Sequence, residues 1–585
     1  GTAGASGSGG AAGGGGPAGG GGGAGGGVGG AGGGGGVVDV RLLAFNDFHG
    51  NLEALKSLTV ITKAKTDTTP EEKVEAGGAA YLAAHVAALR QGQPNTLVVS
   101  AGDLIGGTPL TSALFHDEPT IEAMNALGLT VNGVGNHEFD EGRDELLRIV
   151  NGGCHPVDQC DFTPPGAPAP TYDGADFAVL AANVVVEATG QTLLPPTHVV
   201  ERGGAKVAFV GLTLEGTPSV VTQSAVAGLS FRDEVETVNA LVPGLKAQGA
   251  DAVVVVVHQG GVQKGLYNEC VDLAGDIVAI AEGLDPAVDV VVSGHTHQAY
   301  NCTVGGKLVT SALSAGRVLT AIDLRVDRAA HAVVAKSAEN HIVTRDVAPD
   351  PTVAALLDVT LATAGPLANR VVGQIEADIL HEPTSPTAPS GETPLGDLIA
   401  DAQLAATSAP DQGSAQIAFM NPGGIRAPLL FSPGGTVADG NVTYGALFAV
   451  QPFGNYLVTM TLTGRQIETL LEQQVTPLGT ERGRILQVSN GFTYAWDPNK
   501  FVDAAARKPD IDPATIKLNG VTLDPNGSYR VTVNSFLAGG GDGFAVLKEG
   551  ASRLDGGDDL VALEAYVAAH SPVAVPPADR ITRLP

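Results

Sequence analysis

The feature that most limits how this chain can fold is a set of short hydrophobic runs, each followed closely by Asp, Asn or His. Continuous apolar runs of this length are typical of strands buried on both faces of a sheet. In open α/β sheets, ligands gather beyond the carboxyl ends of the strands. The runs and the polar residues after them are Leu42–Phe45 before Asp47 and His49, Leu97–Val99 before Asp103, Val131–Val134 before Asn136, Val253–Val257 before His258, and Val290–Val292 before His295 and His297. The repetition predicts that these side chains meet at one site.

A single Asn-His pair, such as Asn136-His137, is usually no more than a polar turn. Together, however, the seven residues Asp47, His49, Asp103, Asn136, His258, His295 and His297 offer nitrogen and oxygen donors enough for two divalent ions. No cysteine thiolate is among these residues, so they do not form a structural zinc site of the cysteine type. Nitrogen and oxygen donors of this kind suit Zn²⁺, Mn²⁺, Co²⁺ or Fe. Asp103 lies between the two ligand groups in the sequence and is the natural bridging carboxylate.

Two ions about 3.5–4 Å apart share a hydroxide that attacks phosphorus while the ions neutralise charge on the phosphoryl oxygens. His137 is adjacent to the ligand Asn136 and is free for another task. Asp140, three residues further on, can orient its imidazole and favour the protonated form. We therefore assign His137, with Asp140, to stabilising the transition state and protonating the leaving oxygen. The alternative for Asp140 is an ordinary acid at a helix N-terminus.

The net charge limits which partners the protein can bind, and the cysteines indicate its cellular compartment. A net charge of −29 argues against nucleic acid or an anionic membrane as a partner. We find no uninterrupted apolar stretch of about 18 residues and expect no transmembrane segment. The four cysteines allow three pairings, of which Cys154–Cys160 and Cys270–Cys302 close the shortest loops. Disulfides favour an exported protein, whether extracellular, periplasmic or at the cell surface; buried free thiols are the alternative.

The sequence divides into four parts. Residues 1–36 contain 24 Gly and no charged side chain, so they cannot build an apolar core. They are either a flexible tether or, since extended glycine chains can approach closely, an element that assembles several copies. Residues 37–345 alternate strands with helices and predict a layered α/β domain with the metal site. Residues 346–369 predict a linker helix, and 370–585 a second domain. Within the first domain, the helix expected at 234–248 is predicted to break at Pro243.

The motifs Asp-x-His, Gly-Asp, Gly-Asn-His-Glu and Gly-His-x-His together resemble those of the calcineurin-like metallophosphoesterases. Turn-rich motifs in the second domain, Asn421 to Arg426, Pro452 to Asn455 and Phe536 to Phe544, narrow the resemblance to the 5′-nucleotidase family. The resemblance covers about residues 38–585. It implies an α/β fold in which a four-layer β-sandwich flanked by helices is followed by a separate α/β substrate-binding domain.

The resemblance also implies roles for individual residues. One ion would be held by Asp47, His49, Asp103 and His297, and the other by Asp103, Asn136, His258 and His295. In the second domain, Phe453 and Phe536 would stack on both faces of a nucleotide base. Asn455 and Asp542 would contact ribose or base edges, and Asn421 and Arg426 would lie near ribose and phosphate. Domain rotation would deliver the phosphate to the ions. Taken alone, each phenylalanine is more typical of a core.

The implied function is an exported two-metal hydrolase that releases phosphate from nucleoside 5′-phosphates. The sequence departs from the family before Glu392, where Ser390-Gly391 stands in place of a segment that commonly carries Arg. One cation beside the phosphate is therefore missing or comes from elsewhere. UDP-sugars or 2′,3′-cyclic nucleotides remain alternative substrates. A different kind of alternative is a structural protein, a surface or filament subunit built on the same fold.

Overall fold

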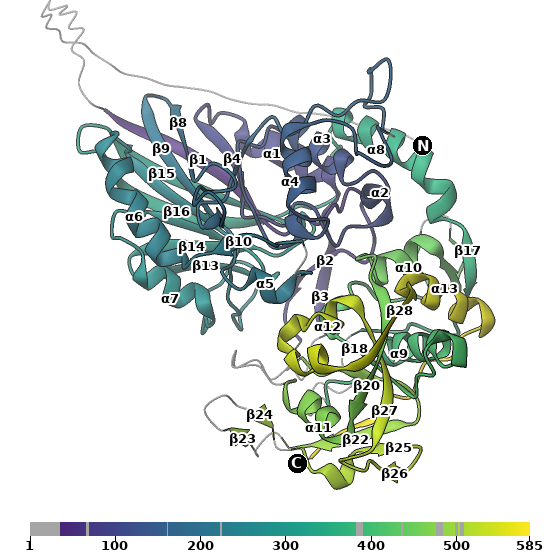
Figure 1. Cartoon of the computed structure of the whole chain (residues 1–585). Helices are drawn as coiled ribbons and strands as arrows, with labels where there is room; N and C mark the ends of the chain where they lie inside the picture. Colours follow the sequence, from purple (N-terminus) through teal and green to yellow (C-terminus); the bar gives the residue numbers. More distant parts are fainter. Residues whose placement is uncertain are drawn as a thin grey trace, which may run out of the picture.

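The computed structural model describes residues 36–65, 70–160, 162–222, 225–381, 390–434, 437–474, 484–497, 501–503, 508–509 and 511–584. The prediction of a tether or assembly element concerns residues 1–36 and lies outside this part of the chain, except for Gly36. Two domains are visible in Figure 1, one in purple to teal and one in green to yellow.

The N-terminal domain contains two six-stranded sheets. In the first sheet, with order β16-β15-β1-β4-β5-β6, strand β1 is parallel to β4 and antiparallel to β15. Its strands are β1 Val37–Phe45, β4 Thr96–Ser100, β5 Val131–Gly133, β6 Ala178–Leu180, β15 Val318–Asp327 and β16 Ala332–Ile342. In the second, with order β13-β14-β12-β11-β9-β8, the strands β9, β11, β12 and β14 are parallel. Its strands are β8 Thr197–Arg202, β9 Ala205–Leu212, β11 Ala252–Val257, β12 Val290–Ser293, β13 Ala299–Val304 and β14 Lys307–Ala312.

Side-chain alternation along the strands builds the layers. Leu42 in β1 belongs to a core shared with Phe209 and Val256 of the other sheet, so the two sheets pack face to face. Leu43, one residue on, belongs to the core beneath the helices on the outer face of the first sheet. These helices are α1 Ala79–Arg90, α3 Glu118–Leu127, α4 Arg143–Asn151 and α8 Pro351–Ala368. Helices α6 Glu234–Ala247 and α7 Asp276–Gly283 cover the second sheet. The result is the expected four-layer α/β arrangement.

One expectation for this domain was wrong. Helix α6 is not broken at Pro243 but runs through it. Pro243 lies on the exposed side of α6, where water can satisfy the carbonyl that the missing N–H leaves free. The hairpin of β15 and β16 forms in a region where the sequence pattern was weak.

Both predicted disulfides, Cys154–Cys160 and Cys270–Cys302, are present.

Helix α8 leads from the N-terminal domain to strand β17 Val371–Gln374 (Figure 1). Among the described helices, α8 alone has the length and apolar composition of a membrane span, with a mean hydropathy of 1.3. This is weak evidence for a membrane span, because helices of globular proteins share these properties. Helix α8 contacts α1, α2 (Leu110–Ala113) and α3.

The C-terminal domain is built on a five-stranded sheet with order β21-β18-β27-β20-β28. Its strands are β18 Ile417–Met420, β20 Tyr456–Thr463, β21 Gln487–Val488, β27 Ser528–Asn534 and β28 Ala551–Asp558. The helices are α9 Pro394–Thr407, α10 Tyr444–Val450, α11 Gly464–Glu472, α12 Ser535–Ala538 and α13 Asp559–Ala569. A smaller sheet has the order β26-β25-β22-β29. Its strands are β22 Phe492–Trp496, β25 Lys517–Leu518, β26 Val521–Thr522 and β29 Ile581–Arg583. Helix α9 begins directly after Thr393, whose side chain accepts a hydrogen bond from the backbone N–H of Gly396.

Candidate active site

The seven predicted ligand residues come together at the carboxyl ends of parallel strands. Asp47 and His49 follow β1 of the first sheet, Asp103 follows β4 and Asn136 follows β5. The other three histidines, His258, His295 and His297, follow β11 and β12 of the second sheet. The two sheets therefore contribute to one site from opposite sides. Asp47, Asp103 and His258 are fully buried, whereas His295 and His297 remain partly exposed.

One group joins Asp47, His49 and His297. The Nε2 atoms of the two histidines are 3.2 Å apart, and Nε2 of His297 lies 3.3 Å from Oδ1 of Asp47. The second group joins Asp103, His258 and His295, with Nε2 of His258 at 2.8 Å from Oδ2 of Asp103.

Two contacts connect these groups with the remaining predicted ligands. Asn136 Oδ1 lies 3.0 Å from Nδ1 of His295 and so belongs with the second group. Oδ2 of Asp103 is also 3.7 Å from Nε2 of His49, which places Asp103 between the groups.

The histidine hydrogen bonds test whether cations fit here. Nδ1 of His258 lies 2.7 Å from the carbonyl oxygen of Ala101, and Nδ1 of His49 lies 2.8 Å from that of Gly106. A carbonyl only accepts, so each Nδ1 is the donor and each neutral ring turns the lone pair of Nε2 toward the carboxylates. Nε2 of His258 is buried and makes no hydrogen bond among the described residues, despite its closeness to Asp103. Lone pairs that face carboxylates in a buried site are stabilised by positive charge between them, either a proton or a metal ion, and the nitrogen and oxygen donors fit divalent ions.

The charge balance of the cluster agrees with this. Burial alone would lower the pKa of His258, yet the negative charges of Asp103, Asp47 and Glu138 raise it to about 10. A site that holds a proton this firmly strongly favours positive charge.

Backbone strain is concentrated at the same residues. The φ angles of Asp47, His49, Asp103, His295 and His297 are 50°, 46°, 50°, 71° and 54°. Side chains other than glycine rarely adopt this left-handed region, and such strain is typical of functional sites. The loops also approach closely, since a Cβ on Gly135 would lie 2.1 Å from Oδ1 of Asp103. Only glycine fits there.

Glu138 ties two ligand loops together. Its carboxylate accepts hydrogen bonds from the backbone N–H groups of Asp103, Leu104 and Gly135 at 3.0, 2.9 and 2.7 Å. Glu138 belongs to the Gly-Asn-His-Glu motif, but nothing in the sequence indicated this role. Because it sits between the loops and is buried, Glu138 positions Asp103 rather than binding a ligand itself.

His137 and Asp140 form the predicted pair. Nδ1 of His137 lies 2.8 Å from Oδ2 of Asp140, and the backbone N–H of His137 donates to Oδ1 of Asp103 at 2.9 Å. Burial lowers the pKa of His137, but the charges of Asp140 and Asp103 outweigh it and raise the pKa above its usual value. The pair thus has the geometry of an oriented, protonated imidazole.

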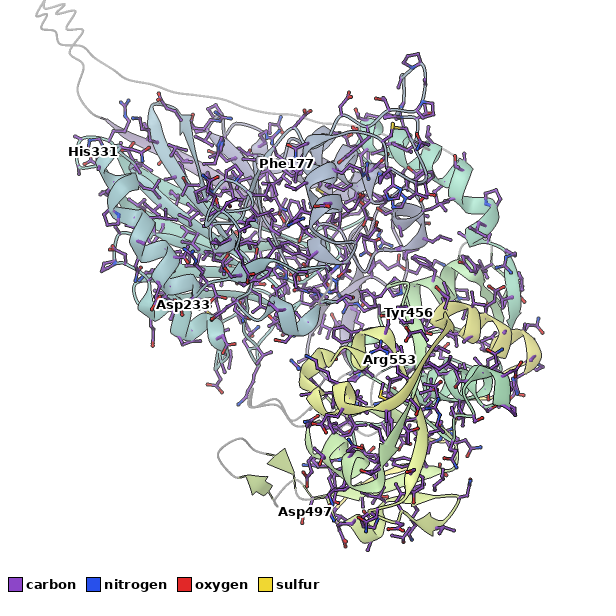
Figure 2. The ribbon with its side chains drawn as sticks, in the orientation of Figure 1. Phe177, Asp233, His331, Tyr456, Asp497 and Arg553 are labelled. Atoms are coloured by element: carbon purple, nitrogen blue, oxygen red, sulfur yellow. A yellow bond between two sulfur atoms is a disulfide. The ribbon has the colours of Figure 1, made fainter. Side chains whose placement is uncertain are left out.

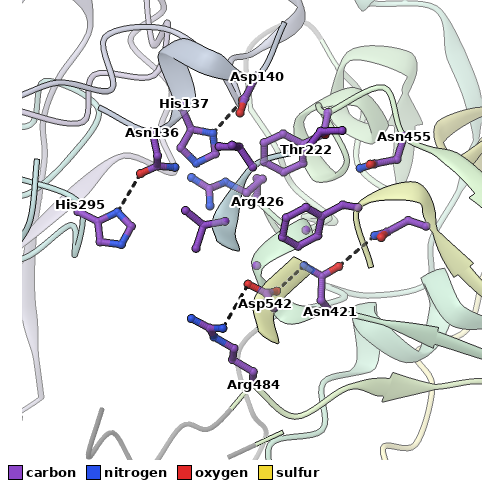
Figure 3. Close-up of a pocket in the computed structure, with 17 residues that line it drawn as sticks. Asn136, His137, Asp140, Thr222, His295, Asn421, Arg426, Asn455, Arg484 and Asp542 are labelled. Carbon is purple, nitrogen blue, oxygen red and sulfur yellow. Dashed lines mark hydrogen bonds and ion pairs between the residues drawn. The ribbon is translucent and has the colours of Figure 1, made fainter. Parts of the chain in front are cut away.

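A cavity of about 250 Å³ lies between the two domains and joins this pair to the C-terminal domain (Figure 3). All six predicted substrate residues line it. The lining residues are Asn136, His137, Asp140, Val220, Val221, Thr222, His295, Asn421, Gly423, Gly424, Arg426, Phe453, Asn455, Arg484, Asn534, Phe536 and Asp542. Asn136 and His295 of the ligand cluster, the His137–Asp140 pair and the C-terminal motifs therefore line one cavity.

The polar lining residues are held in place by one another. Asn421 donates to Oδ2 of Asp542 at 2.9 Å and accepts from Asn534 at 3.0 Å. Asn455 accepts from the hydroxyl of Ser535 at 2.9 Å. Asp542 has a φ of 56°, a second instance of a strained residue that faces the cavity.

The two phenylalanines have different neighbours. Phe453 stacks on the imidazole of His137, with ring centroids 5.6 Å apart and an angle of 17° between the planes. The guanidinium of Arg426 lies over the same phenyl ring at 5.7 Å. Phe536 instead packs against Gly541, where an added Cβ would lie 2.5 Å from the ring. Phe453 thus contacts both domains, whereas Phe536 belongs to the C-terminal wall alone.

Sequence reasoning missed Arg484 and the segment Val220–Thr222. Arg484 lies just before β21, lines the cavity, and has Nη1 at 3.9 Å from Oδ1 of Asp542 (Figure 3). It is a second cation in the cavity beside Arg426. The missing Arg before Glu392 was the one signal that a cation had to come from elsewhere in the chain. It did not indicate that Arg484 is this cation.

Comparison with known proteins gives two family matches. A model of the calcineurin-like phosphoesterases matches residues 40–299, and a model of the 5′-nucleotidase C-terminal domain matches residues 371–549. The chain is 26% identical over 519 residues to the 5′-nucleotidase of Vibrio cholerae, covering 82% of this chain and 84% of that protein. The crystal structure of a 5′-nucleotidase precursor from Thermus thermophilus is 28% identical, with a TM-score of 0.73 over 94% of this chain and 99% of that one.

Other relatives carry different names. The chain is 33% identical over 502 residues to the endonuclease YhcR of Bacillus subtilis, covering 86% of this chain, and 31% identical over 538 residues to the cell wall protein Lmo0130 of Listeria monocytogenes, covering 88%. It spans only 37% and 64% of the lengths of these two proteins.

Proposed function

Since this chain belongs to the 5′-nucleotidase family and is a phosphoric ester hydrolase, we propose that it releases phosphate from nucleoside 5′-phosphates with two divalent ions. The observation that carries this proposal is the cavity between the domains. His137, Asn136 and His295 line one side of it, and aromatic and polar residues of the C-terminal domain line the other. A nucleotide has the same two parts, a phosphate at one end and an aromatic base at the other.

The proposal assigns one ion to Asp47, His49, Asp103 and His297 and the other to Asp103, Asn136, His258 and His295. Zn²⁺, Mn²⁺, Co²⁺ and Fe all suit this set of nitrogen and oxygen donors. When bound, two such ions lower the pKa of water and neutralise charge on phosphoryl oxygens.

His137 supplies the proton in this scheme. Asp140 holds Nδ1 of the ring, which leaves Nε2 as the nitrogen that can donate to the leaving oxygen of the ester. Phe453 lies against one face of the imidazole, and Gly106 and Gly107 line a neighbouring cavity together with His137 and Phe453, so the ring has little freedom to turn. Because the ring is held in one orientation, its Nε2–H points at one place and can donate its proton to a leaving oxygen there.

The C-terminal wall would bind the nucleoside. The face of Phe536 can stack on any base. Asp542 and Asn421 offer acceptors and donors to ribose hydroxyls, and Asn455 can contact polar edges of ribose or base. Arg426, whose charge acts on Asp47, Asp103 and Asp140, sits on the phosphate side. Arg484 would supply the cation that the sequence lacks before Glu392.

Alternative substrates follow from the relatives rather than from the geometry. One relative is named a trifunctional nucleotide phosphoesterase and another an endonuclease. The pair of arginines also suits a UDP-sugar, which has two phosphates, and 2′,3′-cyclic nucleotides remain an alternative. A purely structural subunit is less favoured, because every one of the seven ligand positions is filled and five of the seven residues have a strained backbone.

We also propose export to the cell surface, the periplasm or the medium. The two disulfides support it, since such bonds persist in oxidising compartments. The name of the Listeria relative, a cell wall protein, points the same way. Whether residues 1–36 tether the enzyme or join copies of it is tested by deleting them and comparing sedimentation.

Phosphate release tests the proposal. Chelator-treated protein is reloaded separately with Zn²⁺, Mn²⁺ or Co²⁺ and assayed with AMP, UMP, ATP, UDP-glucose and 2′,3′-cyclic AMP. We expect hydrolysis of the 5′-monophosphates that is lost with the chelator and restored by metal. Preferential cleavage of UDP-glucose or the cyclic ester would shift the assignment to the alternatives. No release from any of the five with any metal would overturn the enzymatic proposal.

A further inference from the structure

The loop between α10 and β20 carries Phe453 and is bonded at both ends to one residue, Asp559. At the start of the loop, Nε2 of Gln451 donates to Oδ2 of Asp559 at 3.2 Å. At its end, the carbonyl oxygen of Asn455 accepts a hydrogen bond from the backbone N–H of Asp559 at 2.9 Å. Asp559 is the first residue of α13, and α10 and α13 lie side by side (Figure 1). A residue from a distant part of the sequence thus anchors both ends of the loop.

This loop is the part of the C-terminal domain that meets the proposed proton donor. Phe453 stacks on His137, and Asn455 lines the substrate cavity. Tyr456, the next residue, lies in the part of the C-terminal domain nearest the N-terminal domain (Figure 2). Between the two anchored ends the chain turns sharply at Gly454, which has a φ of 60°. Because the loop is so short, a shift at either end moves Phe453 and Asn455 together.

Asp559 differs from an ordinary acid at the start of a helix. Such acids commonly interact with the helix dipole from an exposed position, whereas Asp559 and Gln451 are each only 2% exposed. The cap of α13 is supplied by Asp558, whose side chain accepts a hydrogen bond from the backbone N–H of Val561 at 3.0 Å. The carboxyl group of Asp559 therefore has another role.

The buried carboxyl and amide groups each leave one oxygen without a partner. Oδ1 of Asp559 and Oε1 of Gln451 make no hydrogen bond among the described residues. Burial, together with the negative charge of Asp558, raises the pKa of Asp559 well above its ordinary value, so the neutral form is favoured. A neutral carboxyl group has one O–H donor, and an amide oxygen is an acceptor. One proton can thus satisfy both oxygens.

We propose that Asp559 is a positioning residue for the hydrolysis. In its neutral form its O–H donates to Oε1 of Gln451, and the resulting acid–amide pair holds the loop so that Phe453 rests against His137. Asp559 is not among the residues that line the substrate cavity, so it acts through the loop and not on the substrate. The inference rests on the proposed nucleotide hydrolysis, because it assigns Asp559 to that reaction.

The same support extends to Arg426. Its backbone N–H donates to the carbonyl oxygen of Val450 at 2.9 Å, directly before Gln451 in the chain. The guanidinium of Arg426 lies over the ring of Phe453. The acid–amide pair therefore holds the end of α10 from which both the ring and the cation are placed.

Steady-state kinetics of full-length, metal-loaded protein with AMP and p-nitrophenyl phosphate test this role. Asp559→Leu removes the carboxyl group and leaves the amide of Gln451 unpaired. We expect kcat to fall about 10- to 100-fold on both substrates, since a misplacement of about 1 Å can cost 10²-fold. KM should rise for AMP alone, because Asn455 also moves. Asp559→Asn reproduces the neutral acid, with an N–H in place of the O–H, and should stay within about threefold of the wild type.

A double-mutant cycle separates positioning from general stability. In the Phe453→Ala background, Asp559→Leu should lower kcat by less than about threefold, because the side chain that the loop positions is already absent. A loss that came from general destabilisation would be the same in both backgrounds.

Asp397→Leu is the matched control. Asp397 is also a buried carboxyl residue in the first turn of a helix of the C-terminal domain, and both its oxygens lack hydrogen bonds among the described residues. It lies beside Arg580, however, and not beside the Phe453 loop. This variant should lower Tm and leave kcat and KM near their wild-type values.

Wild-type kinetics in Asp559→Leu would overturn the proposal. So would equal losses in Asp559→Leu and Asp559→Asn, or an undiminished loss in the Phe453→Ala background. If circular dichroism shows that Asp559→Leu does not fold, Gln451→Leu replaces it with the same expectations. If the wild type cleaves neither substrate, the proposed function fails and hydrogen exchange decides on the loop. Residues 450–456 should then exchange faster in Asp559→Leu than in Asp397→Leu, and equal rates would count against the proposal.

Discussion

His137 is the residue on which the proposed chemistry depends most directly among those that bind no metal. His137→Ala should lower turnover of AMP by about 10²–10⁴-fold, the usual contribution of a positioned acid. Metal content should stay unchanged, since no ligand is lost. Asp103→Asn should lose both activity and metal, because Asp103 lies between the two ligand groups. Kinetics together with metal analysis separates the two effects. Loss of metal in His137→Ala would make His137 a ligand rather than an acid.

The two phenylalanines are expected to behave differently, because only Phe453 contacts His137. Phe536→Ala should weaken nucleotide binding roughly 5- to 100-fold, the range for one base stacked on an aromatic ring, and spare a small aryl phosphate. Phe453→Ala should impair both substrates, since it also frees the imidazole. KM and kcat for AMP and p-nitrophenyl phosphate measure this. Equal losses on both substrates in Phe536→Ala would identify that ring as core.

At the level of elements, the first turn of α9 carries a buried carboxyl group that affects stability. Burial raises the pKa of Asp397 to about 9, with Glu392 and Asp401 acting in the same direction and Arg580 opposing them. Both carboxyl oxygens lack hydrogen bonds among the described residues. The folded protein therefore keeps a proton on Asp397 that the unfolded chain releases above its ordinary pKa, near 4.

It follows that the contribution of Asp397 to stability is present in full below about pH 4 and is lost as the pH rises toward 9. Asp397→Asn mimics the protonated form and should make Tm less sensitive to pH between 5 and 9. Thermal melts of both proteins across this range measure the effect. Asp411→Asn, at an exposed position, is the control. Identical pH profiles for Asp397→Asn and the wild type would contradict the assignment.

The elements also explain what the sequence could predict. Strands buried on both faces need apolar residues at every position, so Val253–Val257 was easy to recognise and His258 stood out behind it. Strand β16 lies at a sheet edge, where polar residues such as Lys336 and Glu339 interrupt the pattern, and it was missed. The contacts of His116 with His155 and Asp158 have no sequence motif, because these residues meet only when the loop closed by Cys154–Cys160 packs on the turn between α2 and α3. Similarly, nothing in the sequence near Arg484 signals its approach to Asp542.

At the scale of the whole molecule, the substrate cavity exists only while the domains are in contact. We expect the nucleotide to enter when the C-terminal domain swings away and to react when it returns. Gly107 lies at this contact with a φ of 56°, and a Cβ there would lie 3.2 Å from Cε1 of Phe453 and 3.7 Å from Nδ1 of His137. Any side chain at position 107 would press on the other domain.

Gly107→Ala should therefore lower kcat/KM for AMP by about tenfold or more, because Phe453 and the domain that carries it are displaced. Gly92→Ala is the matched control. Its φ of 75° imposes a similar backbone cost, yet a Cβ there meets nothing within 4 Å. Comparing activity and Tm for both variants separates the contact from the backbone strain. Equal losses of activity would show that the domain contact is unimportant.

The order of strands in the first sheet has a consequence for biosynthesis. Strand β1 lies between β4 and β15, and its partner β15 ends at Asp327, some 280 residues later in the chain. A chain emerging from the ribosome thus exposes one unpaired edge of β1 until most of the N-terminal domain has been made. Asp47 and Asp103 are synthesised early, but His258, His295 and His297 are not. The nascent chain is consequently unable to complete either ligand group, so metal loading must wait for a nearly finished domain.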